Sequence, residues 1–312
     1  MVMTQIGNSD LDIFPLVFGG NVFGWTADKA TSFDLLDGFV DGGGNLIDTA
    51  DGYSHWVPGN SGGESETIIG EWMTSRRNRD RVLIATKVGT HPRFTGLRPE
   101  TINGAIDASL TRLQTDHVDL YYAHFDDPAV PMADIVGALS ALVDAGKVRY
   151  IAPSNFSAAR IDEWADVTQA NGWHAAVALQ PLYNLMDRGF ETNGLRDAAE
   201  RYHLGVLPYY ALAAGFLTGK YRPGTTVTGD RAPKASKYLD ARGEAVLAAL
   251  DEIGAAHGVQ PASVAIAWLR NQPTVAAPIA SASRLDQLPA LLAGATLELT
   301  PEELKALTAS SL

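Results

Sequence analysis

The chain has 312 residues, of which 46% are hydrophobic, and its 36 acidic and 24 basic side chains give a formal net charge of -12. This acidic balance argues against a nucleic-acid partner or an anionic membrane, because both bind basic patches. The absence of cysteine excludes disulfides, thiolate metal ligands and a cysteine nucleophile. No apolar stretch approaches the ~20 residues that a membrane span needs, and residues 1–5 have no signal-peptide pattern, so we expect a cytoplasmic protein.

The first half of the chain alternates between strand and helix patterns. Residues 6–14 predict a short hairpin, because a weak alternation surrounds Gly7, Asn8 and Ser9. The helix predicted over 28–41 has apolar residues at helical spacing and ends at three glycines, 42–44. The other elements predicted here are strands at 16–18, 45–48, 82–87 and 118–124, and helices at 64–73, 99–113 and 132–145.

The second half continues this alternation around one irregular insertion, rich in Gly, Pro and Thr, at about 218–233. The predicted elements are strands at 148–154, 176–180, 205–209 and 275–279, helices at 158–170, about 191–202, 240–257 and 261–271, a helix from Arg284, and a tail helix opened by Thr300-Pro301-Glu302-Glu303. Eight strand–helix units without a compositional break predict one α/β domain over residues 1–312. We expect a closed (β/α)8 TIM barrel with a short N-terminal hairpin and a C-terminal helix. A doubly wound sheet is the alternative, although residues 18–24 do not fit its glycine-rich phosphate turn.

Four polar residues stand at or just after the ends of three consecutive predicted strands: Asp48, Tyr53, Lys87 and His124. An apolar run that ends in such a residue predicts a strand that leaves the core and presents its last side chain at a mouth. The Lys87 ammonium should lower the pKa of the Tyr53 phenol, while Asp48 compensates the lysine and holds it in place. With His124 donating a hydrogen bond, the set suits protonation of an oxygen that gains negative charge.

Structural alternatives exist for each of these residues taken alone. Asp48 and Lys87 would serve as a simple ion pair, Tyr53 as a loop aromatic and His124 as a histidine satisfied by local hydrogen bonds. The presence of all four residues in one layer favours a functional site over these separate structural roles. A metal site is not predicted, because one well-placed histidine without paired carboxylates makes a poor ligand set. An isomerase or lyase with Lys87 as a Schiff base is disfavoured, because pairing with Asp48 keeps the lysine protonated.

The motif Ile47-Asp48-Thr49-Ala50-Asp51-Gly52-Tyr53, followed by Gly63-Glu64-Ser65-Glu66 and Ile69-Gly70, resembles the first signature of the aldo-keto reductase family. Ala85-Thr86-Lys87 and Asp119-Leu120-Tyr121-Tyr122-Ala123-His124 resemble the segments that carry its lysine and histidine. The resemblance covers nearly the whole chain and implies hydride transfer from NADPH to an aldehyde or ketone as a small-molecule substrate. It implies that Tyr53 is the general acid, that Lys87 and Asp48 tune it, and that His124 orients the carbonyl.

The same resemblance implies a nicotinamide cofactor bound along the later strands. Ser154, Asn155 and Gln180 would hold the carboxamide, which needs both donors and acceptors, and Tyr209 or its neighbour Tyr210 would stack on the ring. Residues 212–221 are similar to the loop over the pyrophosphate, and Ser283 with Arg284 would share the 2′-phosphate, so NADP is favoured with NAD as the alternative. The expected cofactor-binding residues are Gly20, Asn21, Asp48, Ser154, Asn155, Gln180, Tyr209, Leu212, Ala213, Gly215, Leu217, Lys220, Ser281, Ser283, Arg284 and Gln287.

The loops after the first two predicted strands carry aromatic residues that would wall a substrate pocket. The expected substrate-binding residues are Phe23, Trp25, Tyr53, His55, Trp56 and His124, which favour an aromatic or aliphatic carbonyl. The alternative function is a cofactor-sensing regulatory subunit, because the Ser283 variant of the adenosine motif is similar to that of the potassium-channel β-subunits of this family. We expect the enzyme, because few residues precede the first predicted strand.

Overall fold

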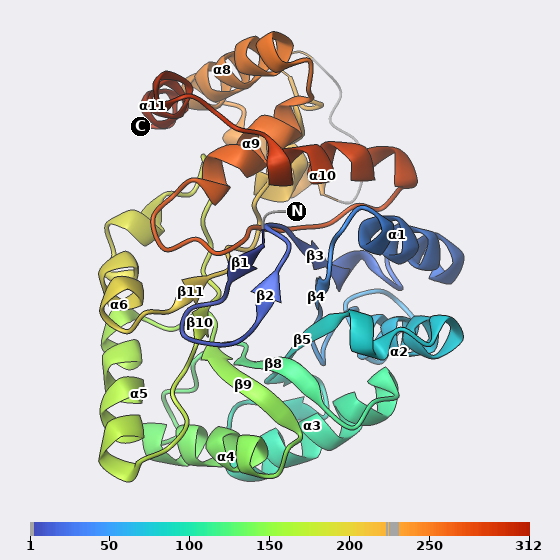
Figure 1. The fold of residues 1–312 in the computed structure, drawn as a ribbon, viewed down its shortest axis with the longest axis vertical. Helices are drawn as coiled ribbons and strands as arrows, with labels where there is room; N and C mark the ends of the chain where they lie inside the picture. Colours follow the sequence, from blue (N-terminus) through green and yellow to red (C-terminus); the bar gives the residue numbers. More distant parts are fainter. Residues whose placement is uncertain (1–2, 223, 225–230) are drawn as a thin grey trace.

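The computed structural model describes residues 3–222, 224 and 231–312, and they form an α/β fold around a parallel sheet (Figure 1). Six strands pair in the order β12-β3-β4-β5-β8-β9. They are β3 (Val17–Gly19), β4 (Leu46–Asp48), β5 (Leu83–Val88), β8 (Val118–Ala123), β9 (Val148–Pro153) and β12 (Ile279–Ala280). β10 (Ala178–Leu179) and β11 (Gly205–Val206) form a second parallel pair. Parallel bridges join Ile151 to Ala176 and Val206 to Val275, so this pair lies beside both edges of the larger sheet.

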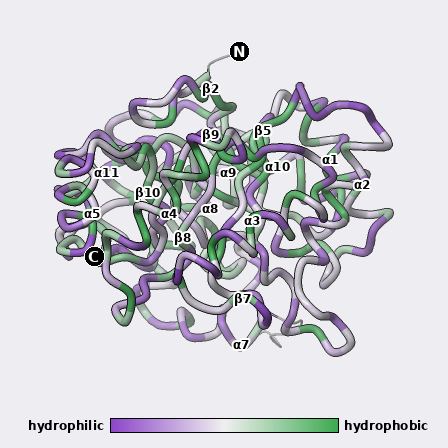
Figure 2. The backbone as a smooth tube through the Cα atoms, turned by 90° about the horizontal axis from the view of Figure 1, so that it is seen from below, coloured by the Kyte–Doolittle hydropathy of each residue, from purple (hydrophilic) through white to green (hydrophobic). Residues whose placement is uncertain are grey.

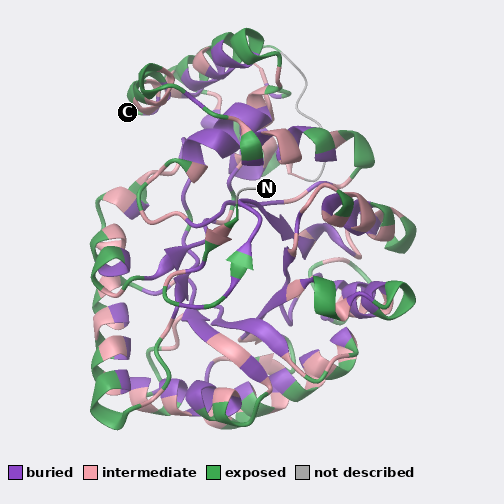
Figure 3. Ribbon diagram, viewed as in Figure 1, coloured by how far each residue is buried: buried purple, intermediate pink, exposed green. Residues whose placement is uncertain are grey.

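Helices surround the strands and cover their outer side (Figure 1). They are α1 (Lys29–Asp41), α2 (Glu64–Arg76), α3 (Pro99–Leu113), α4 (Met132–Asp144), α5 (Ala158–Asn171), α6 (Leu195–Arg201), α7 (Ala232–Ala235), α8 (Ala241–His257), α9 (Pro261–Arg270), α10 (Leu288–Thr296) and α11 (Pro301–Ser310). Local sequence explains several starts: Asp28 and Ser157 cap α1 and α5, and Thr300 with Glu303 forms a capping box on α11. Figure 3 shows buried strands and exposed outward faces on these helices. The prediction of an α/β fold is therefore confirmed.

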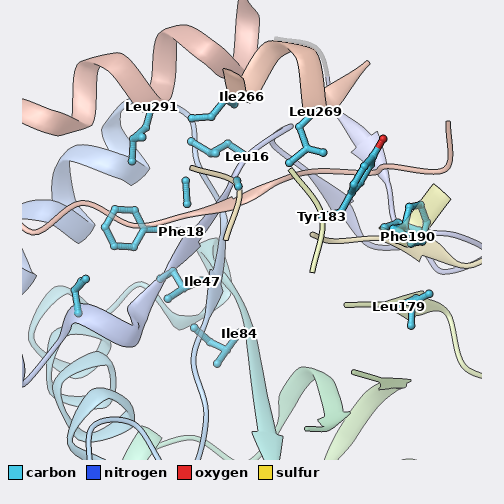
Figure 4. Packing of buried hydrophobic residues seen from close by; sticks show 14 of the residues in the cluster. Leu16, Phe18, Ile47, Ile84, Leu179, Tyr183, Phe190, Ile266, Leu269 and Leu291 are labelled. Atoms are coloured by element: carbon cyan, nitrogen blue, oxygen red, sulfur yellow. The ribbon is translucent and has the colours of Figure 1, made fainter. Parts of the chain in front are cut away.

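Apolar side chains pack on both sides of the strands. Between strands and helices, Leu16 and Phe18 lie in one buried cluster with Ile266 of α9 and Leu291 of α10 (Figure 4). A separate cluster is formed by Val17, Leu46, Ala85, Leu120, Tyr122, Ala152, Ala178, Leu207 and Ala277, with Ile6, Leu11 and Ile13. Since strand residues alternate between faces, the second cluster marks the inner side of the strands.

The predicted hairpin is present as antiparallel β1 (Thr4–Gln5) and β2 (Asp12–Ile13). Its residues Ile6, Leu11 and Ile13 are buried against the inner cluster, so the hairpin covers one end of the strands. Figure 2 shows β2 at that end, whereas α7 and β7 (Phe94–Thr95) lie at the opposite end.

The structure corrects two predicted elements and adds one that was not predicted. The last strand pairs with β3 through Ile279 and Ala280, whereas Val275 makes only an isolated bridge. The helix expected from Arg284 begins as a 3-10 turn at Leu285–Gln287, and α10 follows. A hairpin of β6 (Thr90–His91) and β7 was not predicted, because two-residue strands are too short to show alternation.

Part of the predicted insertion at 218–233 lies outside the described residues, namely 223 and 225–230. Within the described ranges, no helix combines the length and apolar character needed to cross a membrane.

Candidate active site

Strand register brings Asp48, Lys87 and His124 to one place. Asp48 lies opposite Ala85 in β5, two residues before Lys87, and Lys87 lies opposite Tyr122, two residues before His124. Because strand side chains alternate, these steps of two keep all three side chains on the same face. Ala85 and Tyr122 belong to the inner cluster, so that face is the inner side of the strands. The predicted grouping of these strand ends is therefore observed.

Lys87 is the centre of this group, and its side chain is fully buried. Its ammonium donates to Asp48 Oδ2 at 2.6 Å and to the Thr49 carbonyl at 2.7 Å, and it lies 3.5 Å from the Tyr53 hydroxyl. Burial alone would lower the pKa of Lys87, but the Asp48 carboxylate and Tyr53 outweigh it and raise that pKa. The lysine is therefore a permanent cation beside the phenol.

Lys87 acts to lower the pKa of Tyr53, as expected, but the net shift of that pKa in the structure is upward. Burial of the phenol is the largest influence on the pKa of Tyr53 and raises it, and the attraction of Lys87 only partly offsets that effect. A buried tyrosinate is costly because the charge loses its hydration. Tyr53 consequently keeps its proton at neutral pH, with a cation 3.5 Å away to stabilise the anion once that proton leaves.

His124 lies next to Tyr53, with ring centroids 6.0 Å apart. Burial, followed by repulsion from Lys87, lowers the pKa of His124 well below its ordinary value. The imidazole is therefore neutral and carries one N–H. Its Nδ1 lies 3.2 Å from the Thr90 hydroxyl.

A cavity of about 660 Å³ opens over this group. Its wall holds both the proposed acid and many of the residues expected to bind a cofactor or substrate. The predicted site residues that line it are Asn21, Trp25, Asp48, Tyr53, His55, Trp56, His124, Ser154, Asn155, Gln180, Tyr209, Leu212, Gly215 and Ser281.

Hydrogen bonds connect the residues expected to bind a carboxamide with Asp48 and His124. Gln180 Nε2 donates to Asp48 Oδ1 at 2.9 Å, and Asn155 Nδ2 donates to the His124 carbonyl at 2.9 Å. The Tyr209 hydroxyl donates to Asn155 Oδ1 at 2.7 Å. The residues expected to bind the cofactor and the residues around Lys87 therefore form one hydrogen-bond network, which fixes their relative positions.

Phe23 corrects the prediction of the substrate wall. Its ring is fully buried and stacks on Phe18, with centroids 5.7 Å apart. It belongs to the core between strands and helices rather than to the cavity wall. Its place after the first strand was the only basis for the prediction, and loop position does not determine side-chain direction.

Several predicted cofactor residues lie away from the cavity wall: Gly20, Ala213, Leu217, Lys220, Ser283, Arg284 and Gln287. Leu217 is buried in the core, and the exposed Lys220 lies over the Tyr221 ring. Gln287 Oε1 accepts from the Ser283 backbone at 2.9 Å, and Arg284 pairs with Asp286 at 3.0 Å.

The sequence did not single out Arg231 and Lys234 as cavity-lining residues. Arg231 lies over the Trp25 ring, and its Nη2 is buried without a hydrogen-bond partner among the described residues. Lys234 donates to the Tyr210 hydroxyl at 3.3 Å. Two basic residues at the end of the insertion, in an acidic chain, were the available signal, but nothing local showed that they return to the strand ends.

Phe125 and Thr90 also line the cavity and were missed. Phe125 is 52% exposed and directly follows His124, so an apolar side chain after a strand end was the available signal. Thr90 belongs to the hairpin that was not predicted.

Comparison with known proteins identifies the family of this chain. The family model described as Aldo/keto reductase family matches residues 15–311. The chain is 32% identical to Protein tas of Escherichia coli (strain K12), covering 96% of this chain and 94% of that protein. It is 32% identical to Aldo-keto reductase YhdN of Bacillus subtilis (strain 168), covering 92% and 85%, and 30% identical to Norsolorinic acid reductase B of Aspergillus parasiticus, covering 96% and 81%. The predicted resemblance is confirmed: the chain belongs to the aldo/keto reductase family and is an oxidoreductase.

Proposed function

We propose that this enzyme reduces an aldehyde or ketone with NADPH and that Tyr53 gives the proton to the carbonyl oxygen. The observation that carries the proposal is the buried Lys87 ammonium, 3.5 Å from a protonated Tyr53 that faces a cavity. A cation next to a phenol lowers the cost of the tyrosinate that proton donation leaves behind.

The cavity residues fit a nicotinamide cofactor. Ser154, Asn155 and Gln180 line it and offer a hydroxyl and two amides, which match the donors and acceptors of a carboxamide. The unpartnered Nη2 of Arg231 fits an anionic group such as a phosphate, because a buried donor without a partner is costly. NADP rather than NAD is supported by the exposed guanidinium of Arg284, which pairs with Asp286 at the surface.

The chemical step divides among the side chains. A nicotinamide held by Ser154, Asn155 and Gln180 would supply the hydride. Tyr53 donates its proton to the carbonyl oxygen as that oxygen gains negative charge, and Lys87 stabilises the phenolate. His124 is proposed to donate a hydrogen bond from Nε2 to the same oxygen. Asp48 keeps Lys87 in place, and Gln180 holds the other oxygen of Asp48.

Aromatic side chains at the mouth support an aromatic carbonyl as substrate. Trp56 is 44% exposed and makes edge contacts with Trp25 at 5.8 Å and Tyr53 at 5.7 Å. Exposed aromatic surface around a concave site favours apolar ligands. One relative bears a name that fits this class, Aryl-alcohol dehydrogenase GME11368 of Pestalotiopsis microspora.

We further propose that residues 1–312 are one domain and that its strands close into an eight-stranded barrel. The first core strand, β3, pairs with the last, β12. The bridges Ile151–Ala176, Ser154–Gln180 and Val206–Val275 continue the parallel order through β10 and β11. In such a barrel the active site lies at the carboxyl ends of the strands, where Lys87 and His124 are found.

The test is NADPH oxidation measured with a panel of aromatic and aliphatic carbonyls. We expect Tyr53→Phe to lose at least ~100-fold in kcat while its Kd for NADPH, measured by fluorescence titration, stays near that of wild type. Equal turnover by wild type and Tyr53→Phe would refute the assigned acid. Tight NADPH binding without turnover of any carbonyl would instead favour a cofactor-sensing role.

A further inference from the structure

A chain of hydrogen bonds leads from His124 to a carboxyl group that the proposed mechanism does not use. Thr90 Oγ1 lies 3.2 Å from His124 Nδ1 and 3.2 Å from Asp51 Oδ1. Asp51 is fully buried, and its other oxygen, Oδ2, accepts the Gly89 backbone N–H at 3.1 Å. A proton on this carboxyl therefore belongs on Oδ1, the oxygen that faces Thr90.

The Thr90 hydroxyl has a single proton and cannot donate to both neighbours. When Asp51 is ionised, its Oδ1 can only accept, so Thr90 donates to Asp51 and its oxygen accepts from His124 Nδ1–H. When Asp51 is protonated, its O–H donates to Thr90, and Thr90 donates to an unprotonated His124 Nδ1. A neutral imidazole carries one N–H, so the first state leaves Nε2 bare and the second places the proton on Nε2.

We propose that the protonation state of Asp51 sets the tautomer of His124 through the Thr90 hydroxyl, and so decides whether Nε2 donates or accepts a hydrogen bond at the substrate oxygen. The inference rests on the proposed function, in which His124 Nε2 contacts that oxygen. Asp51 and Thr90 act through His124 and are positioning residues. Protonated Asp51 favours reduction, because a carbonyl oxygen needs a donor. Ionised Asp51 favours oxidation, because an alcohol hydroxyl needs an acceptor.

The change from the protonated to the ionised state of Asp51 releases one proton from the protein. As pH rises, His124 Nε2 releases its proton to solvent in the cavity, the Thr90 proton passes to Nδ1, and the Asp51 Oδ1 proton passes to the Thr90 oxygen. Asp51 is then ionised and accepts from Thr90, and the charge of His124 does not change. His124 itself stays neutral because burial, and then Lys87, lower its pKa.

The surroundings of Asp51 place this switch near neutral pH. Burial is the largest influence and raises the pKa of Asp51 to about 7, and repulsion from Glu66 of α2 adds to it. The Gly89 N–H, Thr90 and the Arg112 guanidinium of α3 act in the opposite direction. The charge on Arg112 is largely directed to Glu66, whose carboxylate it contacts at 2.7 Å. The Tyr121 hydroxyl of β8 also faces this region, and burial raises its pKa well above the ordinary value, so it stays neutral.

The chain offers matched variants at both positions. In Asp51→Asn, the amide NH2 can donate to Thr90 and the carbonyl can accept from Gly89, so this variant imitates the protonated acid at every pH. Thr90→Val keeps the shape of the side chain but removes the hydroxyl, and Thr90→Ser keeps the hydroxyl.

The direct test is ¹⁵N NMR of the imidazole rings, which distinguishes protonated from bare ring nitrogens and needs no turnover. The signal of His124 among the seven histidines is identified by its loss in His124→Asn. Between about pH 6 and about pH 8, wild type and Thr90→Ser should change from the Nε2–H to the Nδ1–H tautomer. Asp51→Asn should keep Nε2–H throughout, and Thr90→Val should lose the change.

A wild-type tautomer that stays constant over this range, or a change that persists in Asp51→Asn, would overturn the proposal. The kinetic test follows kcat for reduction with pH. Wild type should lose about tenfold per pH unit above the Asp51 pKa, and Asp51→Asn should lack this inflection. If the tautomer changes as expected while His124→Asn reduces carbonyls normally, the assigned role of His124 fails and the switch itself stands.

Discussion

Replacing Asp51 with asparagine should stabilise the fold at neutral and alkaline pH. In the folded enzyme burial raises the pKa of Asp51 from 3.8 to about 7. Between these values the folded state holds a proton that the unfolded chain has released, so the free energy of unfolding falls as pH rises through this window. A difference of about three pH units at ~1.4 kcal/mol each gives a loss of about 4 kcal/mol across the window.

The part of this loss that lies between pH 5 and pH 8 is about 2.5 kcal/mol. The asparagine side chain has no proton to lose, so the variant's free energy of unfolding should not show this loss. The difference in free energy of unfolding between the variant and wild type should therefore grow by about 2.5 kcal/mol from pH 5 to pH 8. Urea unfolding at each pH measures the difference, and Asp41→Asn, at the exposed end of α1, is the control for removing one negative charge. Parallel pH profiles for wild type and Asp51→Asn would refute the argument that this buried carboxyl titrates near neutrality.

Three further predictions concern the rest of the site. Lys87→Met should destabilise the fold by ~3–5 kcal/mol in urea unfolding, because it leaves the Asp48 carboxylate buried without its cation. The double variant with Asp48→Asn should recover part of that loss. A double variant no more stable than Lys87→Met would contradict the pairing. Arg231→Met should weaken NADPH binding about tenfold in a fluorescence titration, whereas Arg81→Met, on an exposed residue, should leave it unchanged, and equal affinities would remove Arg231 from the cofactor site. Trp56→Ala should raise KM about tenfold for an aromatic aldehyde but much less for a short aliphatic one, and a uniform rise would show that this ring does not select the substrate.

Local pattern predicted the elements that have a strong repeating signal. The helix predicted at 99–113 has the bounds of α3 because Pro99 begins it and its apolar residues recur at helical spacing. The two-residue strands of the β6–β7 hairpin have no such signal, and they were missed. The same argument applies to β12, where pairing with β3 rather than residue type decides which residues belong to the strand.

The sequence by itself determined the family, the α/β alternation and the grouping of Asp48, Lys87 and His124, because a strand period of two and a parallel register carry side chains at strand ends to one face. The tertiary structure decided what depends on distant neighbours and on burial. It placed Arg231 over Trp25 and Thr90 between Asp51 and His124, and it buried Phe23. It also decided the sign of the Tyr53 pKa shift, because the loss of hydration outweighs the attraction of Lys87, and hydration depends on how the whole chain packs around the hydroxyl.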